Sequence, residues 1–175
     1  MTSLRNRCAV LFVVAFGLVV SACIKSQEAK FPLSNAVPVL GDGGRYRMYD
    51  RVDGGKFIRG DLIEMRKRQD GGYDFIDPQK ETIPVSFHRV GGGGLHAVQS
   101  KNGKDAPGYE YLLVRIEGGE ILTFAPDCEK QDKSMLTALG VEIRKDECII
   151  DGVKDPADLF AKFSLGEPTA KLVRE

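Results

Sequence analysis

The chain has 175 residues but no tryptophan and only two histidines. The absence of tryptophan disfavours a carbohydrate-stacking site, because this side chain offers the largest flat apolar ring. No Gly-x-Ser-x-Gly motif is present, which argues against the nucleophile elbow of hydrolases. His88 and His96 could begin a zinc site, but a catalytic site needs three protein ligands and a structural site four, so Asp or Glu would have to come from distant positions. We therefore expect no metal and no cofactor.

An excess of charge of either sign is also missing. Lysine and arginine number 25, and aspartate and glutamate also number 25. A near-neutral protein has no strong electrostatic attraction for nucleic acid or for anionic lipid. We therefore expect no nucleic-acid partner, and any attachment to a membrane needs another source.

A long membrane-spanning run is absent too. Residues 8–20 form an apolar run of thirteen, short of the roughly 20 residues that a spanning helix needs. Arg5 and Arg7 precede this run without any acid, and Val20-Ser21-Ala22-Cys23 follows it. A basic start, an apolar centre and a small-residue cleavage site are typical of a secretory signal peptide.

The sequence Val20-Ser21-Ala22-Cys23 also resembles the lipobox of bacterial lipoproteins. The resemblance implies cleavage before Cys23 and palmitate-type lipidation of its sulfur, and two or more acyl chains anchor a protein stably. Because Ile24 rather than aspartate follows, it also implies sorting to the outer membrane, facing the periplasm. It concerns the export segment alone. Removal of 22 residues would leave 153, with 23 basic residues (25 minus Arg5 and Arg7) against 25 acidic ones.

We predict three parts: a cleaved signal at residues 1–22, a lipidated tether at 23–40 and a single domain at 41–175. The tether begins polar and carries Pro32 and Pro38. About 20 extended residues would reach about 60 Å, enough to hold a domain clear of the lipid. Phe31 and Val37 are more apolar than a linker requires, so the later half could instead pack as a first edge strand.

The sequence predicts different roles for its four cysteines. Cys8 leaves with the signal and Cys23 takes the lipid, which leaves Cys128 and Cys148 in an oxidising compartment. No Cys-x-x-Cys spacing indicates a redox or metal site, so we predict a structural disulfide. Closing a loop of about 21 residues contributes about 3 kcal/mol.

Paired glycines divide the middle of the chain into short segments rich in Tyr, Val, Ile and Phe. Glycine supplies the positive φ that tight hairpin turns need. The segments are residues 45–51, 57–68, 73–76, 83–90, 95–100, 109–117 and 120–125. This spacing predicts a mainly β fold, an antiparallel meander that forms a sandwich or partial barrel.

Two strand patterns make different predictions about burial. A turn at Gly118-Gly119 pairs Ile116 with Ile121 and makes both hairpin faces apolar, which predicts a central hairpin covered on both sides. Residues 83–88 alternate apolar and polar side chains, which predicts a half-exposed strand.

The end of the chain predicts a disulfide-linked α/β segment. Residues 133–139 favour a short helix, and 141–144 and 147–150 favour strands. Asp155 can then cap a helix that opens with Pro156.

Four consecutive glycines, residues 91–94, separate the two histidines. No Lys-Ser/Thr follows them, so we interpret them as a hairpin tip rather than a phosphate loop. A four-residue loop pairs Val90 with Leu95 and puts the rings of His88 and His96 on opposite faces, whereas a three- or five-residue loop puts them together. Surface histidines are the default interpretation.

A basic strand interleaved with aromatics offers a candidate binding face of Arg45, Tyr46, Arg47 and Tyr49. It could bind an acidic envelope protein or a glycan. The alternative is an edge strand kept soluble by its charge.

These observations favour a non-catalytic, membrane-anchored envelope lipoprotein that binds a partner or inhibits an enzyme. A closed barrel with an apolar cavity would favour a carrier of a small apolar ligand instead. A cleft that places His88 or His96 beside two carboxylates would favour an envelope hydrolase.

Overall fold

The computed structural model describes residues 24–102, 107–144 and 147–175. The predicted signal, its cleavage site and Cys23 lie outside the described residues. The described chain is mainly β, with two short α-helices, as the sequence predicts.

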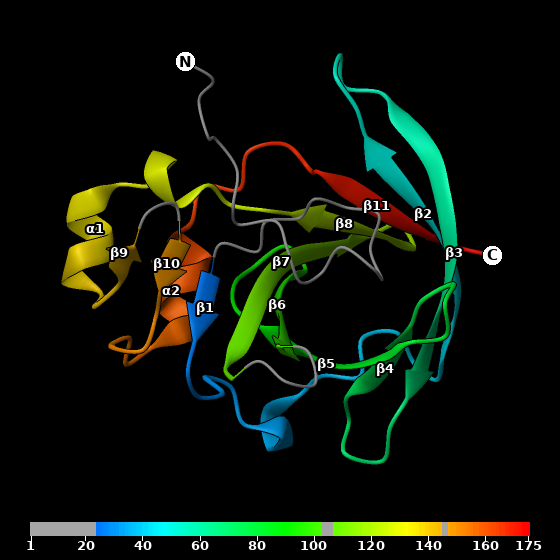
Figure 1. Ribbon diagram of the computed structural model, residues 1–175, viewed down its shortest axis with the longest axis horizontal. Coiled ribbons are helices and arrows are strands. Elements are labelled where there is room, and N and C mark those ends of the chain that lie inside the picture. The colour runs from blue at the N-terminus through cyan, green and yellow to red at the C-terminus, as the bar shows by residue number, and fades with distance from the viewer. Residues whose placement is uncertain (1–23, 103–106, 145–146) are drawn as a thin grey trace.

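Eight strands close into an antiparallel barrel (Figure 1). The first seven follow one another as a meander, and β11 closes the barrel by pairing with both β8 and β2. The sequence left a sandwich or a partial barrel open, and the observed sheet is a closed barrel. In order, its strands are β2 (Gly43–Arg51), β3 (Phe57–Lys67), β4 (Tyr73–Ile76), β5 (Thr82–Arg89), β6 (Leu95–Lys101), β7 (Tyr109–Glu117), β8 (Glu120–Phe124) and β11 (Ala170–Arg174).

Large side chains fill the inside of the barrel. Alternate residues of each strand point inward, because successive side chains leave opposite faces. Tyr73, Phe75 and Phe87 are at most 2 % exposed, so other side chains enclose their rings almost completely. An eight-stranded barrel has just enough room for such filling. The inner cluster comprises Leu40, Tyr46, Met48, Ile63, Met65, Tyr73, Phe75, Val85, Phe87, Val114, Ile121, Ala170 and Leu172.

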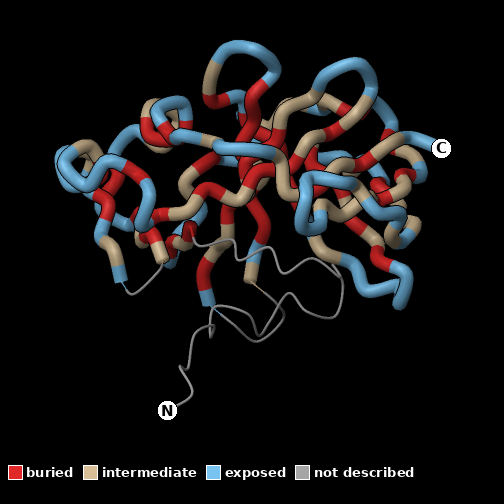
Figure 2. Tube along the Cα trace, turned by 90° about the horizontal axis from the view of Figure 1, so that it is seen from above, coloured by how far each residue is buried: buried red, intermediate tan, exposed pale blue. Residues whose placement is uncertain are grey.

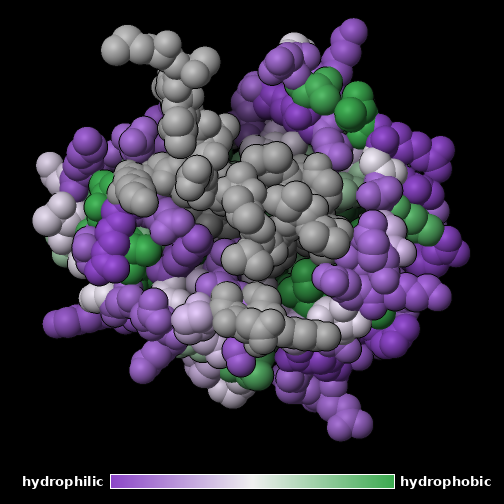
Figure 3. Space-filling view, in the orientation of Figure 1, coloured by the Kyte–Doolittle hydropathy of each residue, from purple (hydrophilic) through white to green (hydrophobic). Residues whose placement is uncertain are grey.

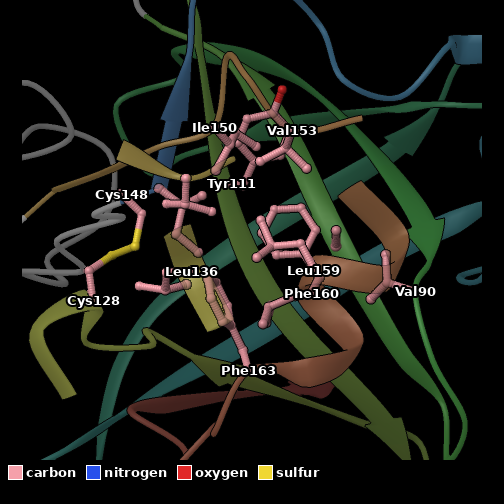
Figure 4. Packing of buried hydrophobic residues seen from close by; sticks show 14 of the residues in the cluster. Val90, Tyr111, Cys128, Leu136, Cys148, Ile150, Val153, Leu159, Phe160 and Phe163 are labelled. Carbon is pink, nitrogen blue, oxygen red and sulfur yellow. A yellow bond between two sulfur atoms is a disulfide. The ribbon is translucent and has the colours of Figure 1, made fainter. Parts of the chain in front are cut away.

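A second apolar core lies outside the barrel, over β5 to β8. Figure 4 shows Leu159 and Phe160 of one helix close to Tyr111 of β7. In Figure 2 the buried residues continue from the barrel into this layer. The covering elements are β1 (Ile24–Ser26), the 3₁₀ turns η1 (Leu33–Asn35) and η2 (Cys128–Lys130), α1 (Lys133–Ala138), β9 (Glu142–Arg144), β10 (Glu147–Ile149) and α2 (Pro156–Lys162).

The predicted disulfide is confirmed between Cys128 and Cys148. Their Cα atoms are 5.8 Å apart and both residues are at most 1 % exposed. The bond joins η2 to β10 across 20 positions of sequence. It therefore closes the covering layer over the outer core, with a contribution of about 3 kcal/mol.

Residues 24–40 do not form the predicted tether. Ile24 is 1 % exposed and lies in β1, which pairs parallel with β10 and antiparallel with β7. The physical reason is that Ile24 and Phe31 bury more apolar surface against the barrel than an extended chain could, and their neighbours find hydrogen-bond partners there. The folded unit therefore includes residues 24–40, which the sequence assigned to a tether.

Two buried side chains hold this N-terminal segment. Gln99 Oε1 accepts hydrogen bonds from Lys30 N and Phe31 N, both at 3.0 Å, and its Nε2 donates to Phe31 O at 3.0 Å. The hydroxyl of Tyr111 lies 2.8 Å from Ser26 Oγ and also accepts from Lys30 N. We call these two side chains the Gln99–Tyr111 clamp.

Further along, the same segment closes one end of the barrel. Val37 N donates to Phe87 O at 2.8 Å, and Leu40 N donates to Tyr73 Oη at 3.1 Å. The Tyr73 hydroxyl then donates to Gly41 O at 2.9 Å. The segment thus joins the outer core to the inner one.

Two local predictions about the strands and helices are confirmed, and a prediction about the exposure of one strand is wrong. Ile116 pairs with Ile121 across the Gly118-Gly119 turn, and Asp155 Oδ1 accepts from Asp158 N to cap α2. Residues 83–88 were predicted to form a strand with one exposed face. This is incorrect, because Ser86 is 2 % exposed beneath the N-terminal segment.

Candidate functional site

The barrel has one covered side and one bare side. Among the described residues, no helix or further strand packs over the outer surface of β2, β3 and β11. Figure 3 shows hydrophilic side chains gathered over this region, at the right of the view. We call it the bare face, and the register of its strands points these residues outward: Arg45, Arg47, Tyr49, Arg51, Phe57, Arg59, Glu64, Arg66, Lys171 and Val173.

Three of the four predicted binding residues lie on the bare face, and Tyr46 does not. Tyr46 is 3 % exposed and belongs to the inner cluster, opposite Ile63 in register. Its inclusion is a correction to the sequence prediction. The alternation of a strand places Tyr46 on the opposite face from Arg45 and Arg47.

Basic and aromatic side chains contact one another on the bare face. Lys171 Nζ lies 5.7 Å from the ring centre of Tyr49 and 5.5 Å from that of Phe57. A cation over an aromatic face is attracted by the ring quadrupole. Lys171 also pairs with Glu120 at 2.8 Å, so its ammonium is held between strands β2, β3 and β8.

Arginines on the same face surround one carboxylate. Arg47 Nε donates to Glu175 Oε1 at 2.8 Å, and Arg59 Nη2 lies 3.6 Å from the same oxygen. The hydrogen bond from Arg47 is the main reason that the pKa of Glu175 is lowered, and the charges of Arg59 and Arg45 add to it. Arg51 forms a separate ion pair with Glu167.

The hairpin between β2 and β3 extends this face past the barrel, as Figure 1 shows at its upper right. It carries two exposed apolar side chains, Val52 at 39 % and Ile58 at 51 %. Val52 lies in the loop just after β2, and Ile58 lies in β3 opposite Asp50. An exposed apolar tip beside basic and aromatic groups has the composition of a protein-contact surface.

The two histidines lie on opposite faces of the β5–β6 pair. Val90 N donates to Leu95 O across the glycine tip, which is the four-residue alternative. His88 pairs in register with Ala97 of the outer core, whereas His96 pairs with Val114 of the inner cluster. The default of surface histidines is wrong, because His88 is 2 % and His96 is 4 % exposed. Apolar layers cover the two faces of this strand pair.

Ser86 and His88 make the nearest approach to a catalytic pair. His88 Nε2 lies 2.8 Å from Ser86 Oγ, a distance suitable for activating a hydroxyl. The ring of Phe31, however, stacks on His88 at 4.7 Å between centres, and Ser86 is 2 % exposed. A substrate cannot reach the hydroxyl while the N-terminal segment is in place, so the pair serves as a mutually satisfied polar contact.

His96 is held by the backbone of the glycine tip. Its Nδ1 lies 2.7 Å from Gly94 O, which favours the tautomer with a proton on Nδ1. Burial is the main cause of its lowered pKa, opposed by the hydrogen bond to Gly94. In this neutral state the ring adds no charge to the inside of the barrel.

Neither a metal cluster nor a spanning helix occurs in the part of the chain that the structure describes. No three His, Cys, Asp or Glu side chains within it converge in a way that could hold a metal ion. No helix in that part has the length and apolar character needed to cross a membrane.

The fold is thus a closed antiparallel eight-stranded barrel with a disulfide-linked α/β layer on one side. Comparisons with protein-family models, with curated proteins and with solved structures find no match for the chain.

The buried His88 makes stability depend on pH. Burial lowers the pKa of His88 to about 4, whereas an unfolded histidine titrates near 6.5. The unfolded chain therefore binds more protons between these values, so the contribution of His88 is fully present above about pH 6.5 and is lost as pH falls toward 4. The loss amounts to about 3 kcal/mol between pH 7 and pH 4.

We predict that His88→Phe flattens this pH dependence by about that amount, because phenylalanine keeps the stack on Phe31 but cannot titrate. Urea unfolding at pH 7 and pH 4 measures the slope for both proteins. The same measurement on His96→Gln shows how much the second histidine contributes to the pH dependence of the unfolding free energy. Equal slopes for the parent and His88→Phe would show that His88 is not buried in solution.

Proposed function

We propose that the chain is a lipid-anchored, non-catalytic binding module of a bacterial cell envelope. The observation that carries the proposal is the bare face, a surface of arginines, Lys171 and two aromatic rings on a barrel whose other side is covered. Charged groups at such a face raise the rate of encounter and select partners, while tyrosine supplies contact area at low entropic cost.

The partner that this chemistry suits is an acidic protein of the envelope. A glycan is the weaker candidate, because the chain has no tryptophan for sugar stacking. The disulfide supports an oxidising location, as such bonds persist in exported proteins. The lipobox-like sequence at residues 20–23 supports the lipid anchor, and Ile24 rather than aspartate after it supports the outer membrane, with the domain in the periplasm.

The position of β1 adds a geometric consequence to the anchor. If Cys23 carries lipid, the next residue already belongs to the sheet, and one residue spans at most about 3.6 Å. The lipid would then hold the barrel directly against the membrane surface. A partner would then bind within a few tens of ångströms of the bilayer, because that distance is about the diameter of one domain.

A carrier of a small apolar ligand is the second candidate, and the closed barrel favours it. Barrels of eight strands can hold one small ligand. The buried rings of Tyr73, Phe75 and Phe87 favour a filled interior instead. A hydrolase has the least support, since the Ser86–His88 pair lies beneath Phe31.

We predict that Cys23→Ser abolishes signal processing and lipid attachment, because the thiol is the atom that would be acylated. Metabolic labelling with palmitate and fractionation of the envelope measure both effects, and Cys8→Ser is the matched control within the same signal. Unchanged palmitate labelling and membrane retention in Cys23→Ser would overturn the anchor.

We predict that the double variant Arg45→Glu/Arg47→Glu loses most of its capture of an acidic envelope partner. Arg45 is exposed and Arg47 is partly exposed on the outer face of β2, so reversing these two charges should spare folding, since surface substitutions usually change stability little. Pull-down from a detergent-solubilised envelope at two salt concentrations measures capture. Lys133→Glu/Lys154→Glu makes the same charge change away from the bare face and should capture normally.

If Arg45→Glu/Arg47→Glu captures the partner as well as the parent does, the proposal that the bare face binds the partner is wrong. A hydrolytic activity of the parent that disappears in His88→Ala/His96→Ala would replace the binding proposal with an enzyme. Co-purification of a stoichiometric apolar molecule would favour the carrier.

A further inference from the structure

Glu175 presents an acidic group to the arginines of the bare face. Its carboxylate accepts from Arg47 of β2 at 2.8 Å and lies 3.6 Å from Arg59 of β3. The pKa of Glu175 is lowered chiefly by the hydrogen bond from Arg47, and the charge of Arg45 contributes. The face therefore already has the geometry that receives a carboxylate.

The backbone brings Glu175 to this place. Glu175 N donates to Arg45 O at 3.0 Å, which continues the β11–β2 ladder by one residue beyond Arg174. Arg47 Nη1 lies 3.5 Å from Gly60 O of β3. The Arg47 guanidinium is therefore positioned by the barrel as well as by its carboxylate partner.

Positive charge exceeds negative charge around this position. Arg47 and Arg59 form ion pairs with the side-chain carboxylate of Glu175, and the charge of Arg45 acts on the same group. Among the described residues, no acidic side chain forms an ion pair with Arg45, and Glu64 opposite it pairs instead with Arg66 at 2.9 Å. The site thus has capacity for a further acidic group.

We propose that Arg45, Arg47 and Arg59 form a carboxylate-binding site for an acidic segment of a partner protein, and that Glu175 occupies this site in cis as a competitor. The inference rests on the proposed binding function and names the chemistry of the partner. Guanidinium groups suit carboxylates because their planar N–H donors match the two oxygens.

Competition in cis lowers the affinity for an acidic segment. The Glu175 carboxylate must leave Arg47 and Arg59 before another carboxylate can take the same donors. Exposed ion pairs are weak, so its removal should tighten binding by about two- to fivefold rather than by orders of magnitude.

The test uses a short fluorescent polyglutamate peptide as the probe and a polyserine peptide as the neutral reference. Fluorescence anisotropy at low ionic strength measures affinity for the exported protein in detergent. Four proteins are compared: the parent, Glu175→Gln, Arg47→Gln/Arg59→Gln and Glu142→Gln. The last is the matched control, because Glu142 also pairs with an arginine on an exposed strand, at 2.7 Å, away from the bare face.

We expect Glu175→Gln to bind polyglutamate about two- to fivefold more tightly than both the parent and Glu142→Gln. Arg47→Gln/Arg59→Gln should weaken binding by about fivefold. If Glu175→Gln matches Glu142→Gln while the arginine variant still loses affinity, competition in cis is wrong and the binding face stands. If the arginine variant binds like the parent, the carboxylate site itself is wrong, whatever the pull-down shows about other partners.

Discussion

The hydrogen bonds of the Gln99–Tyr111 clamp hold the N-terminal segment on the barrel, and this determines which side of the barrel is covered and which is exposed. A single amide side chain takes up the two adjacent N–H groups of residues 30 and 31 and one carbonyl of Phe31. Each such bond contributes about 1 kcal/mol, and leaving a buried partner unsatisfied costs more. The clamp therefore keeps the N-terminal segment on the barrel, although that segment has little secondary structure of its own.

Docking of this segment divides the barrel into two sides with different roles. Phe31 covers the Ser86–His88 pair and stacks on the histidine ring, so the one arrangement that suggests catalysis lies beneath it. The opposite side, formed by β2, β3 and β11, keeps its arginines and aromatic rings open. The side chains that remain accessible there are arginines and aromatic rings, which suit the proposed recognition of acidic groups. If Cys23 carries lipid, the membrane would lie beside β1 on the covered side, and the bare face would lie on the opposite side of the barrel.

Much of the fold follows from local rules, and so could be predicted. Glycine pairs mark the hairpin turns because positive φ costs them little, and alternation defines strands 2 to 8. Asp155 and Pro156 open α2 as capping preferences dictate. The disulfide could be predicted because Cys128 and Cys148 are the two cysteines outside the predicted signal and lipidation site.

What the sequence did not predict depends on contacts between distant residues. β1 has three residues and gains its order from β7 and β10, which are more than 80 positions away in sequence. β11 was missed because nothing nearby signals that it closes a barrel with β2. Burial of His88 could not be foreseen without the position of Phe31. The arginines were identified as a strand feature, but their contact with Glu175 needs the closed barrel.

Hydrogen exchange at the amides of Lys30 and Phe31 tests the central claim most directly. Both amides donate to Gln99 from the stretch between β1 and η1, which forms no helix or strand. If the segment is part of the folded unit, these amides exchange as slowly as core amides of β7 and become fast in Gln99→Ala. If they exchange at the rate of an unfolded chain in the parent protein, residues 24–40 are a tether after all, and the division of the barrel into a covered and a bare side fails.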